Sequence, residues 1–303
     1  MNLNISNTTL GDLFSLGSAS LWSIAVIMMR LVGFHVKVLP FNIFKNAIAT
    51  LGFFLVVLLM GEPLIPDLTI KEWLTLTLSG VLGICLADIF FVASLNRLGA
   101  SLQAIVDCIY APSVILTAYI LFRETVSIQE VVGGTLVGTA ILIGATSSPE
   151  VKSKKDLIFG LTFGASAHIL MAIGALIARD IYREHSVVWV CGYRFLISNI
   201  ILIVYGTFFY NRKDLWSGFT TKGAYFYSYG SAILGSFLAT LCWLSGFKYT
   251  EAGRAAIYNQ MSSVLIAILG IIILREKLTS RKVLGILMGV AGGIVISLSS
   301  SKI

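Results

Sequence analysis

Four ionisable residues lie inside long apolar stretches of the sequence, where charge is uncommon. They are Asp88, Asp107, His168 and Arg194. A charged side chain at the centre of a lipid-embedded helix costs about 2.5–3.5 kcal/mol on insertion scales, so such residues are candidates for function. Burial favours the neutral form of a carboxylate, and histidine titrates near neutral pH. These residue types therefore indicate chemistry in which protons or charged groups of a small molecule are bound.

Two roles are open for each aspartate. Asp88 or Asp107 could face a central cavity, where it would carry a proton or bind a substrate amine. Alternatively, it could form an ion pair with Lys45, Arg97 or Arg194 that only holds helices together. A short turn joins the two apolar stretches, and each aspartate lies about two to three helical turns from it. We therefore expect the two carboxylates at similar depth on neighbouring helices.

His168 has the same two interpretations. Its imidazole could take part in proton coupling, because its charge changes in the physiological pH range. It could equally be a single polar side chain that forms a hydrogen bond across two helices. The sequence leaves both roles open.

The composition indicates which elements must position these residues. The chain has 303 residues, of which 57% are hydrophobic and 12% are charged. Soluble domains carry about 25% charge, so the composition excludes an ordinary soluble enzyme and a disordered protein. The net charge of +7 does not indicate a nucleic-acid binder, because Lys and Arg punctuate apolar runs and form no basic face. We predict an all-α, polytopic membrane protein whose main surroundings are the lipid bilayer.

Ten apolar runs are each about as long as a bilayer-spanning helix, which needs about 20 residues. The N-terminal segment lacks Lys and Arg, so we expect the first run to remain as a helix and not to act as a signal peptide. The predicted spans are 11–29, 41–60, 73–95, 101–122, 128–147, 157–178, 187–210, 223–247, 252–274 and 283–300. Pro112 lies inside the fourth span and predicts a kink or local opening there.

The four cysteines give no indication of a metal or disulfide site. They are Cys85, Cys108, Cys191 and Cys242. Each lies in an apolar run without CxxC spacing, which is typical of buried thiols. We expect no metal and no cofactor.

The two halves of the chain repeat one another. At an offset of 149 residues, Gly11, Leu21, Ile24, Arg30 and Lys45 match Gly160, Leu170, Ile173, Arg179 and Arg194. Further along, the offset becomes 152, and Arg123-Glu124 matches Arg275-Glu276. Each repeat has five predicted spans, an odd number, so the second repeat must enter the membrane from the opposite side. We predict two inverted five-helix repeats, 1–150 and 151–303, with a site between them.

The repeat also pairs candidate binding residues. Asp107 corresponds to Asn259, which lies between Tyr258 and Gln260, so both halves place polar groups at matching depth. Lys45 and Arg194 are equivalent as well. They could extend to the lipid headgroups, or they could attract a carboxylate or phosphate on a substrate. An anion site combined with Asp107 would suit a zwitterion such as an amino acid.

Other residues have structural and functional interpretations side by side. The aromatic side chains could form the walls of a substrate site or belong to core packing and the interfacial belt; they are Trp22, Tyr110, Trp243 and Tyr258. Glu124 and Glu276 end their spans next to arginines, and we expect structural caps or gate latches there. Gly134-x-x-x-Gly138 and Gly285-x-x-x-Gly289-x-x-x-Gly293 put small residues on one helix face, which allows close packing within the molecule or across a homodimer.

With two five-span repeats, a basic residue early in each second span and an acidic residue after each fourth span, the chain resembles the EamA-like family of drug/metabolite transporters. Asp107 departs from the family pattern, in which this position is apolar or weakly polar. The resemblance implies alternating access and the export or exchange of small organic metabolites, often amino acids.

We therefore expect a secondary transporter that is not an enzyme. Its partners would be a small-molecule substrate and protons, and its location a prokaryotic cytoplasmic membrane. The alternatives are a passive metabolite channel and a polytopic membrane enzyme. HExxH and GxSxG motifs, which would support an enzyme, are missing from the sequence. The excess of Lys and Arg in odd-numbered loops favours termini outside the cytoplasm, whereas the resemblance implies termini inside.

Overall fold

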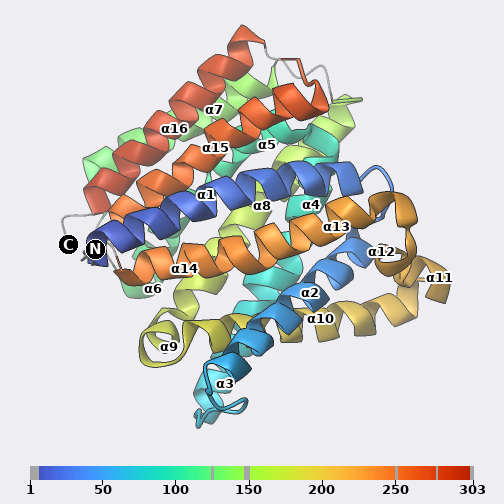
Figure 1. Cartoon of the computed structure of the whole chain (residues 1–303). Coiled ribbons are helices and arrows are strands. Elements are labelled where there is room, and N and C mark those ends of the chain that lie inside the picture. Colours follow the sequence, from blue (N-terminus) through green and yellow to red (C-terminus); the bar gives the residue numbers. More distant parts are fainter. Residues whose placement is uncertain (1–6, 124–125, 147–150, 250–251, 278, 301–303) are drawn as a thin grey trace, which may run out of the picture.

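The structure is a computed structural model, and it describes residues 7–123, 126–146, 151–249, 252–277 and 279–300. These residues form a bundle of helices and contain no strand (Figure 1). Backbone groups within a bilayer must be satisfied inside their own segment, which long apolar helices achieve. The predicted all-α class is confirmed for the described residues.

Among the described residues, eight helical stretches are long and apolar enough to cross a membrane. They are Thr9–Val32, Val38–Leu59, Ile70–Leu98, Ala100–Phe122, Ile128–Ala145, Lys154–Ile177, Val187–Phe209 and Lys222–Gly246. A shorter apolar helix covers Met261–Leu274, and the final helix, α16, covers Ser280–Ser300. Ten membrane spans therefore remain a prediction.

Several of these stretches consist of more than one helical segment. In the first half the segments are α1 (Asn7–Val32), α2 (Val38–Leu59), α3 (Ile70–Gly80), η1 (Val81–Leu86), α4 (Ala87–Leu98), α5 (Ala100–Asp107), α6 (Tyr110–Phe122) and α7 (Ile128–Ala145). In the second half they are α8 (Lys154–Ile177), α9 (Arg179–Glu184), α10 (Val187–Phe209), α11 (Arg212–Leu215), α12 (Ser217–Thr220), η2 (Lys222–Ala224), α13 (Tyr225–Ser231), η3 (Ala232–Ala239), α14 (Thr240–Tyr249), α15 (Ala252–Leu274) and α16. The largest apolar cluster lies between α1, α4 and α15.

The fourth stretch breaks where Pro112 predicts a break. α5 ends at Asp107, Cys108 and Ile109 form a turn, and α6 begins at Tyr110. Proline lacks an N–H, and its ring clashes with the carbonyl four residues earlier, which here belongs to Cys108. The break leaves Asp107 at the end of a helix, next to the interior of the bundle.

Two π-helical segments interrupt long helices at matching places in the halves. Gly83 in η1 corresponds to Gly235 in η3, and both pack closely. A Cβ on Gly83 would lie 3.1 Å from the Gly174 Cα, and a Cβ on Gly235 would lie 2.6 Å from the Ala25 Cβ. Gly174 and Ala25 are themselves equivalent at the 149-residue offset. The same helix contact therefore occurs twice, each time between one half and the other.

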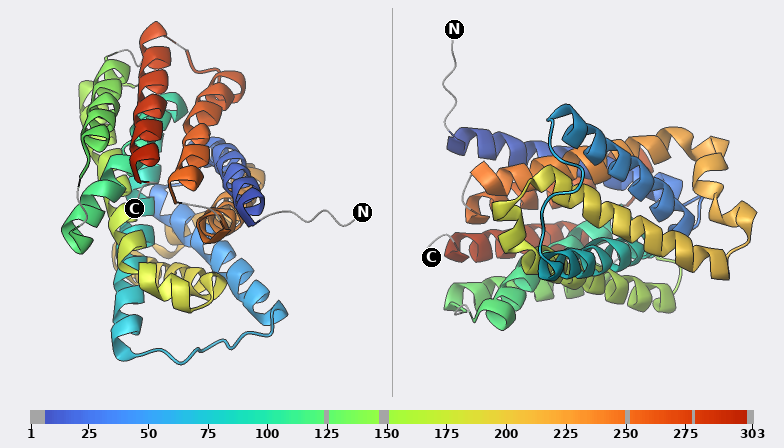
Figure 2. Two further views of the ribbon diagram at one scale, coloured as in Figure 1. Left: turned by 90° about the vertical axis from the view of Figure 1, so that its left-hand side faces the viewer. Right: turned by 90° about the horizontal axis from the view of Figure 1, so that it is seen from below.

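Helices α7 and α16 lie side by side in both views of the bundle (Figures 1 and 2). A Cβ on Gly133 would lie 2.7 Å from the Gly292 carbonyl oxygen, and a Cβ on Gly285 would lie 3.0 Å from the Ala140 carbonyl oxygen. The start of each helix thus faces the later part of the other, so the two run antiparallel. α2 and α10 are another close pair of equivalent helices.

The prediction that Gly134 and Gly138 form the closely packed face of α7 is wrong, because the closely packed glycine is Gly133, one position earlier. Gly138 has no neighbour within 4 Å of an added Cβ, and Gly134 has only the Pro112 side chain at 3.9 Å. Gly133 makes the close contact because the packed face follows a helical spacing of four and three residues through Val137 and Ala140. On α16, Gly285 and Gly289 do pack closely, as predicted. A homodimer through either face remains a prediction.

Candidate functional site

A cavity of about 170 Å³ lies inside the bundle, between side chains from both halves of the chain. It is lined by many of the residues that the sequence singled out: Trp22, Lys45, Asp88, Asp107, Tyr110, His168, Arg194 and Trp243. Further polar and apolar side chains complete the wall, among them Ser18, Met171, Phe195, Ser236, Thr240, Ser262 and Ser263. Residues distant in sequence thus meet around one hollow, which concentrates the ionisable groups of the membrane helices.

Lys45 and Asp88 form an ion pair on this cavity. The Lys45 Nζ donates to Asp88 Oδ2 and also to Asn46 Oδ1 at 3.1 Å. Lys45 is 3% exposed, so it does not extend toward the lipid headgroups. α2 and α4 position the two side chains, and the ammonium lies 5.8 Å from the centre of the Phe195 ring. Of the two roles considered for Asp88, this structure contains the ion pair, which Asp88 forms with Lys45.

Asp107 belongs to a chain of hydrogen bonds at the break between α5 and α6. Its Oδ1 accepts from Gln103 Nε2 at 2.8 Å and lies 2.9 Å from His168 Nε2. Gln103 in turn accepts a hydrogen bond from the Ser94 hydroxyl. Asp107 Oδ2 and His168 Nδ1 are buried and have no hydrogen-bond partner among the described residues. One carboxylate oxygen and one ring nitrogen of this chain of hydrogen bonds thus lack a partner among the described residues.

Arg194 is the second buried cation on the cavity, with 4% of its surface exposed. Its Nη1 donates to the Tyr182 hydroxyl at 2.5 Å, and its Nη2 packs against Gly83. Among the described residues, the Nε has no hydrogen-bond partner, and no carboxylate lies within 4.0 Å of the guanidinium. Arg194 therefore does not reach the headgroups, and it lacks the counter-charge that Lys45 has.

Aromatic rings extend the wall from Asp107 toward the second half. The Tyr110 ring lies 6.3 Å from the His168 ring and 6.2 Å from the Trp243 ring, centre to centre. Trp22 packs against Phe91 at 5.5 Å and also lines the cavity. Stacked or edge-on rings at these distances form stable, apolar surfaces. The cavity therefore combines charged groups with an apolar wall of aromatic rings.

Other predicted residues lie elsewhere. Tyr258 is half-buried and is not among the described lining residues. The side chains of Asn259 and Gln260 lie outside the described part of the structure, as does Glu124.

Glu276 binds the other half of the molecule. Its carboxylate accepts hydrogen bonds from the backbone N–H groups of Ala100 and Ser101, at 2.7 and 2.8 Å, and from the Ser101 hydroxyl. The carboxylate therefore caps the N-terminus of α5, where a negative charge is favourable, while the Glu276 backbone N–H donates to the Gly270 carbonyl of α15 at 3.2 Å. Whether this contact opens as a gate stays a prediction.

The sequence reasoning missed several residues of the site. Gln103 could have been found, because it precedes Asp107 by four residues and side chains at this spacing meet on a helix. Tyr182 gave no signal, since α9 reads as a polar connection between spans. Thr240 is a third omission, because a threonine in an apolar run is ordinary.

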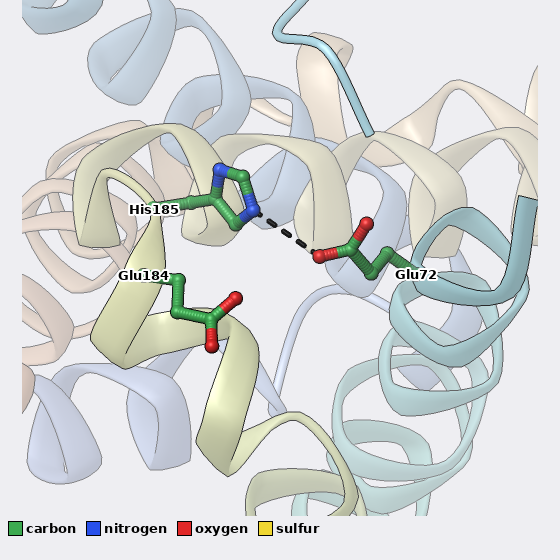
Figure 3. Close-up of side chains that lie close together, drawn as sticks. All are labelled: Glu72, Glu184 and His185. Carbon is green, nitrogen blue, oxygen red and sulfur yellow. Dashed lines mark hydrogen bonds and ion pairs between the residues drawn. The ribbon is translucent and has the colours of Figure 1, made fainter. Parts of the chain in front are cut away.

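A second group of ionisable residues lies outside the cavity, where α3 meets α9. Glu72, Glu184 and His185 have possible ligand atoms within 4.8 Å of one another (Figure 3). Glu72 is already engaged: it accepts from the backbone N–H and hydroxyl of Thr69 and lies 3.2 Å from His185 Nε2. Glu184 is exposed. These contacts cap α3 and connect it to the segment before α10.

The sequence comparisons find a transporter family and relatives that are named as transporters. The sequence model of the EamA-like transporter family matches this chain twice, over residues 9–145 and 158–298. A protein of Archaeoglobus fulgidus named "Uncharacterized transporter" is 24% identical over 90% of this chain and 93% of its own length. A crystal structure with 13% sequence identity shares the fold, with a TM-score of 0.71 over 96% of this chain and 97% of the other.

Two further relatives match over shorter regions. "Uncharacterized transporter YetK" of Bacillus subtilis is 29% identical over 44% of this chain, and "Uncharacterized transporter in sor 3'region" of Acidianus ambivalens is 32% identical over 35%. The matches cover 39% and 36% of those proteins, so this chain spans less than half of the length of either relative.

Proposed function

The chain belongs to the EamA-like transporter family, and from this we propose that it is a secondary-active transporter that moves small organic metabolites through the central cavity by alternating access. It is an integral membrane protein with apolar helices long enough to span a bilayer. Its best-suited cargo is an amino acid or a related zwitterionic or amine compound, carried outward across a prokaryotic cytoplasmic membrane.

One observation carries the proposal: the cavity has buried polar atoms without partners next to an apolar wall. Asp107 Oδ2, His168 Nδ1 and Arg194 Nε are all buried and unpaired among the described residues. An unsatisfied buried polar group costs about 1–3 kcal/mol, and charged groups cost more. A small bound molecule that offers both a donor and an acceptor would recover this free energy. Such sites typically bind small polar cargo.

The arrangement of the halves supports alternating access. The glycine contacts of α7 with α16 occur in equivalent, antiparallel pairs, and η1 and η3 lie at equivalent places. Arg123 and Arg275, also equivalent, have backbone φ angles of 56° and 55°. We therefore propose that 1–150 and 151–303 are inverted repeats of five spans each. Two such repeats can exchange conformations, so that one site opens to either side of the membrane.

The ionisable groups suggest how proton movement could be linked to transport. A substrate ammonium would donate to Asp107 Oδ2, which competes with protonation of the same carboxylate. His168 would accept or release the proton that this exchange requires, because it shares Asp107 Oδ1. Binding of a proton and of the cationic end of the substrate would then exclude one another, as antiport requires.

The test is flux through the purified protein in proteoliposomes, with a panel of radiolabelled amino acids and their decarboxylated amines. We expect saturable flux that falls when the pH gradient is dissipated, and an Asp107→Asn variant whose residual flux no longer follows the gradient. Flux that rises linearly with concentration would favour the alternative of a channel. Conversion of a compound by the detergent-solubilised protein would favour a membrane enzyme. Unchanged flux and pH profile in Asp107→Asn would reject the carrier role of this residue.

A further inference from the structure

The two halves differ at one place on the cavity where the repeat makes a direct comparison possible. Lys45 on α2 corresponds to Arg194 on α10, and Asp88 on α4 corresponds to Thr240 on α14. All four residues line the cavity. In the first half the cation has a carboxylate partner, whereas in the second half the equivalent position holds a neutral hydroxyl. The second half therefore keeps the cation and lacks its anion.

This difference is visible in the contacts of the two cations. Lys45 is bonded to Asp88, which neutralises it. Arg194 is as deeply buried, yet among the described residues it contacts a phenol and backbone and forms no ion pair. A buried charge is strongly destabilising unless a counter-charge satisfies it. The site thus holds a cation that is ready to accept an anion.

We propose that Arg194 binds the carboxylate of the substrate, and that Thr240 leaves free the place where a protein carboxylate would otherwise sit. The proposal rests on the transport function proposed above and specifies its substrate class. In the bound state the substrate would supply the anion that Asp88 supplies in the first half. Lys45, neutralised by Asp88, would shape the cavity without binding the carboxylate itself.

The chemistry favours a carboxylate over a phosphate. A guanidinium presents N–H groups in a planar fork that matches two carboxylate oxygens, and Arg194 still has an unused Nε–H. One carboxylate neutralises one guanidinium, whereas a phosphate dianion would leave a surplus negative charge near Asp107. Asp107 is engaged with Gln103 and His168 through Oδ1. Its free oxygen suits an ammonium on the same substrate.

A first experiment needs no substrate. Thr240→Asp would place the missing carboxylate on α14, and Thr240→Asn is the matched neutral control. We expect Thr240→Asp to raise the midpoint of thermal unfolding in detergent above that of Thr240→Asn, and we expect the difference to vanish when Arg194→Gln is added. An equal or lower midpoint for Thr240→Asp, or a rise that persists without Arg194, would overturn the proposal.

A second experiment tests the substrate class by flux in proteoliposomes. Each amino acid that is transported is compared with its carboxamide, which has the same shape and no negative charge. We expect a preference for the acid in the native protein, and Arg194→Gln should reduce this preference by about ten- to a hundredfold, as expected for a lost charged hydrogen bond. Equal handling of acid and amide by the native protein would overturn the carboxylate proposal while leaving the transport function intact.

The two experiments separate failure of the proposal from failure of the function. If no compound in the panel moves, the proposed transport of these metabolites fails, and the stability comparison still decides whether Arg194 lacks an anion at Thr240. Phosphorylated amines serve as a third set of flux substrates. A stronger preference for them than for the carboxylates would overturn the choice of carboxylate.

Discussion

The two halves of the chain are alike where α7 packs against α16, and they differ along the wall of the central cavity. At the helix contact, Gly133 meets Gly292 and Gly285 meets Ala140, which are equivalent pairs with equally close backbones. Around the cavity, equivalent positions hold different chemistry, as Asp88 and Thr240 do. Close backbone packing accepts only small residues in both halves, so it preserves the repeat. A single asymmetric molecule bound in the cavity would not require the same residue in both halves. The residues of the two halves differ at the cavity.

The largest effect is expected from making the first half resemble the second. Asp88→Thr would leave Lys45 buried without its counter-charge, and removal of one partner of a buried ion pair costs about 3–5 kcal/mol. Asp88 keeps 14% of its side chain exposed, so we expect a cost in the lower part of this range. We expect a large fall in the midpoint of thermal unfolding in detergent, together with loss of flux.

The control for Asp88→Thr is the double variant with Lys45→Met, which removes the unpaired charge. We expect it to recover most of the lost thermal stability. If Asp88→Thr alone unfolds at the native midpoint, the cavity tolerates an unpaired lysine. The contrast that we draw between Lys45 and Arg194 would then have no energetic meaning.

The next largest effect concerns the helix contact itself. Gly133→Val would force a side chain into the backbone of α16, because even a Cβ would lie 2.6 Å from the Ile296 side chain and 2.7 Å from the Gly292 oxygen. Overpacking of this kind costs about 1–3 kcal/mol. We expect a lower yield of folded protein on size-exclusion chromatography and a lower midpoint of thermal unfolding.

Gly138→Val is the matched control for the helix contact, since it introduces the same change on the same helix where nothing lies within 4 Å of an added Cβ. We expect it to behave like the native protein. Equal damage by both substitutions would mean that helix propensity, and not the contact with α16, explains the loss.

A smaller effect is expected at the contact between Glu276 and α5. Glu276→Ala removes three hydrogen bonds from the start of that helix. Loss of an N-terminal cap costs about 0.5–2 kcal/mol. We expect a modest fall in thermal stability and faster exchange of the backbone amide hydrogens of Ala100 and Ser101, measured by mass spectrometry. Unchanged exchange in this segment would contradict the capping role.

Much of the fold follows from the sequence, because apolar length and proline position are local signals. Pro112 predicts the break between α5 and α6, and the apolar runs predict the long helices. The π-helical segments leave no such signal, since η1 and η3 have ordinary apolar compositions. The pair formed by Lys45 with Asp88 was one of several that the sequence allowed. Choosing among them requires side-chain directions that depend on how α2, α4 and α10 cross.

The smallest effect is expected at an exposed ion pair that also joins the two halves. Lys37, between α1 and α2, donates to Asp214 in α11 at 2.9 Å, and both side chains are well exposed. The hydrogen bond from Lys37 holds the pKa of Asp214 below its ordinary value, and the same bond raises the pKa of Lys37. The pair therefore stabilises the fold across neutral pH. Its contribution is lost as the pH falls through the lowered aspartate pKa, or as it rises through the raised lysine pKa.

Exposed pairs of this kind contribute little because water and salt screen them. We expect Lys37→Ala to leave the midpoint of thermal unfolding unchanged at neutral pH and physiological salt, with Asp214→Asn behaving alike. A loss comparable to that of Asp88→Thr would contradict this expectation. It would mean that the connection between the halves depends on their loops as well as on the glycine contacts inside the bundle. Agreement would place the energetic difference between the halves at the cavity, where we propose that the substrate binds.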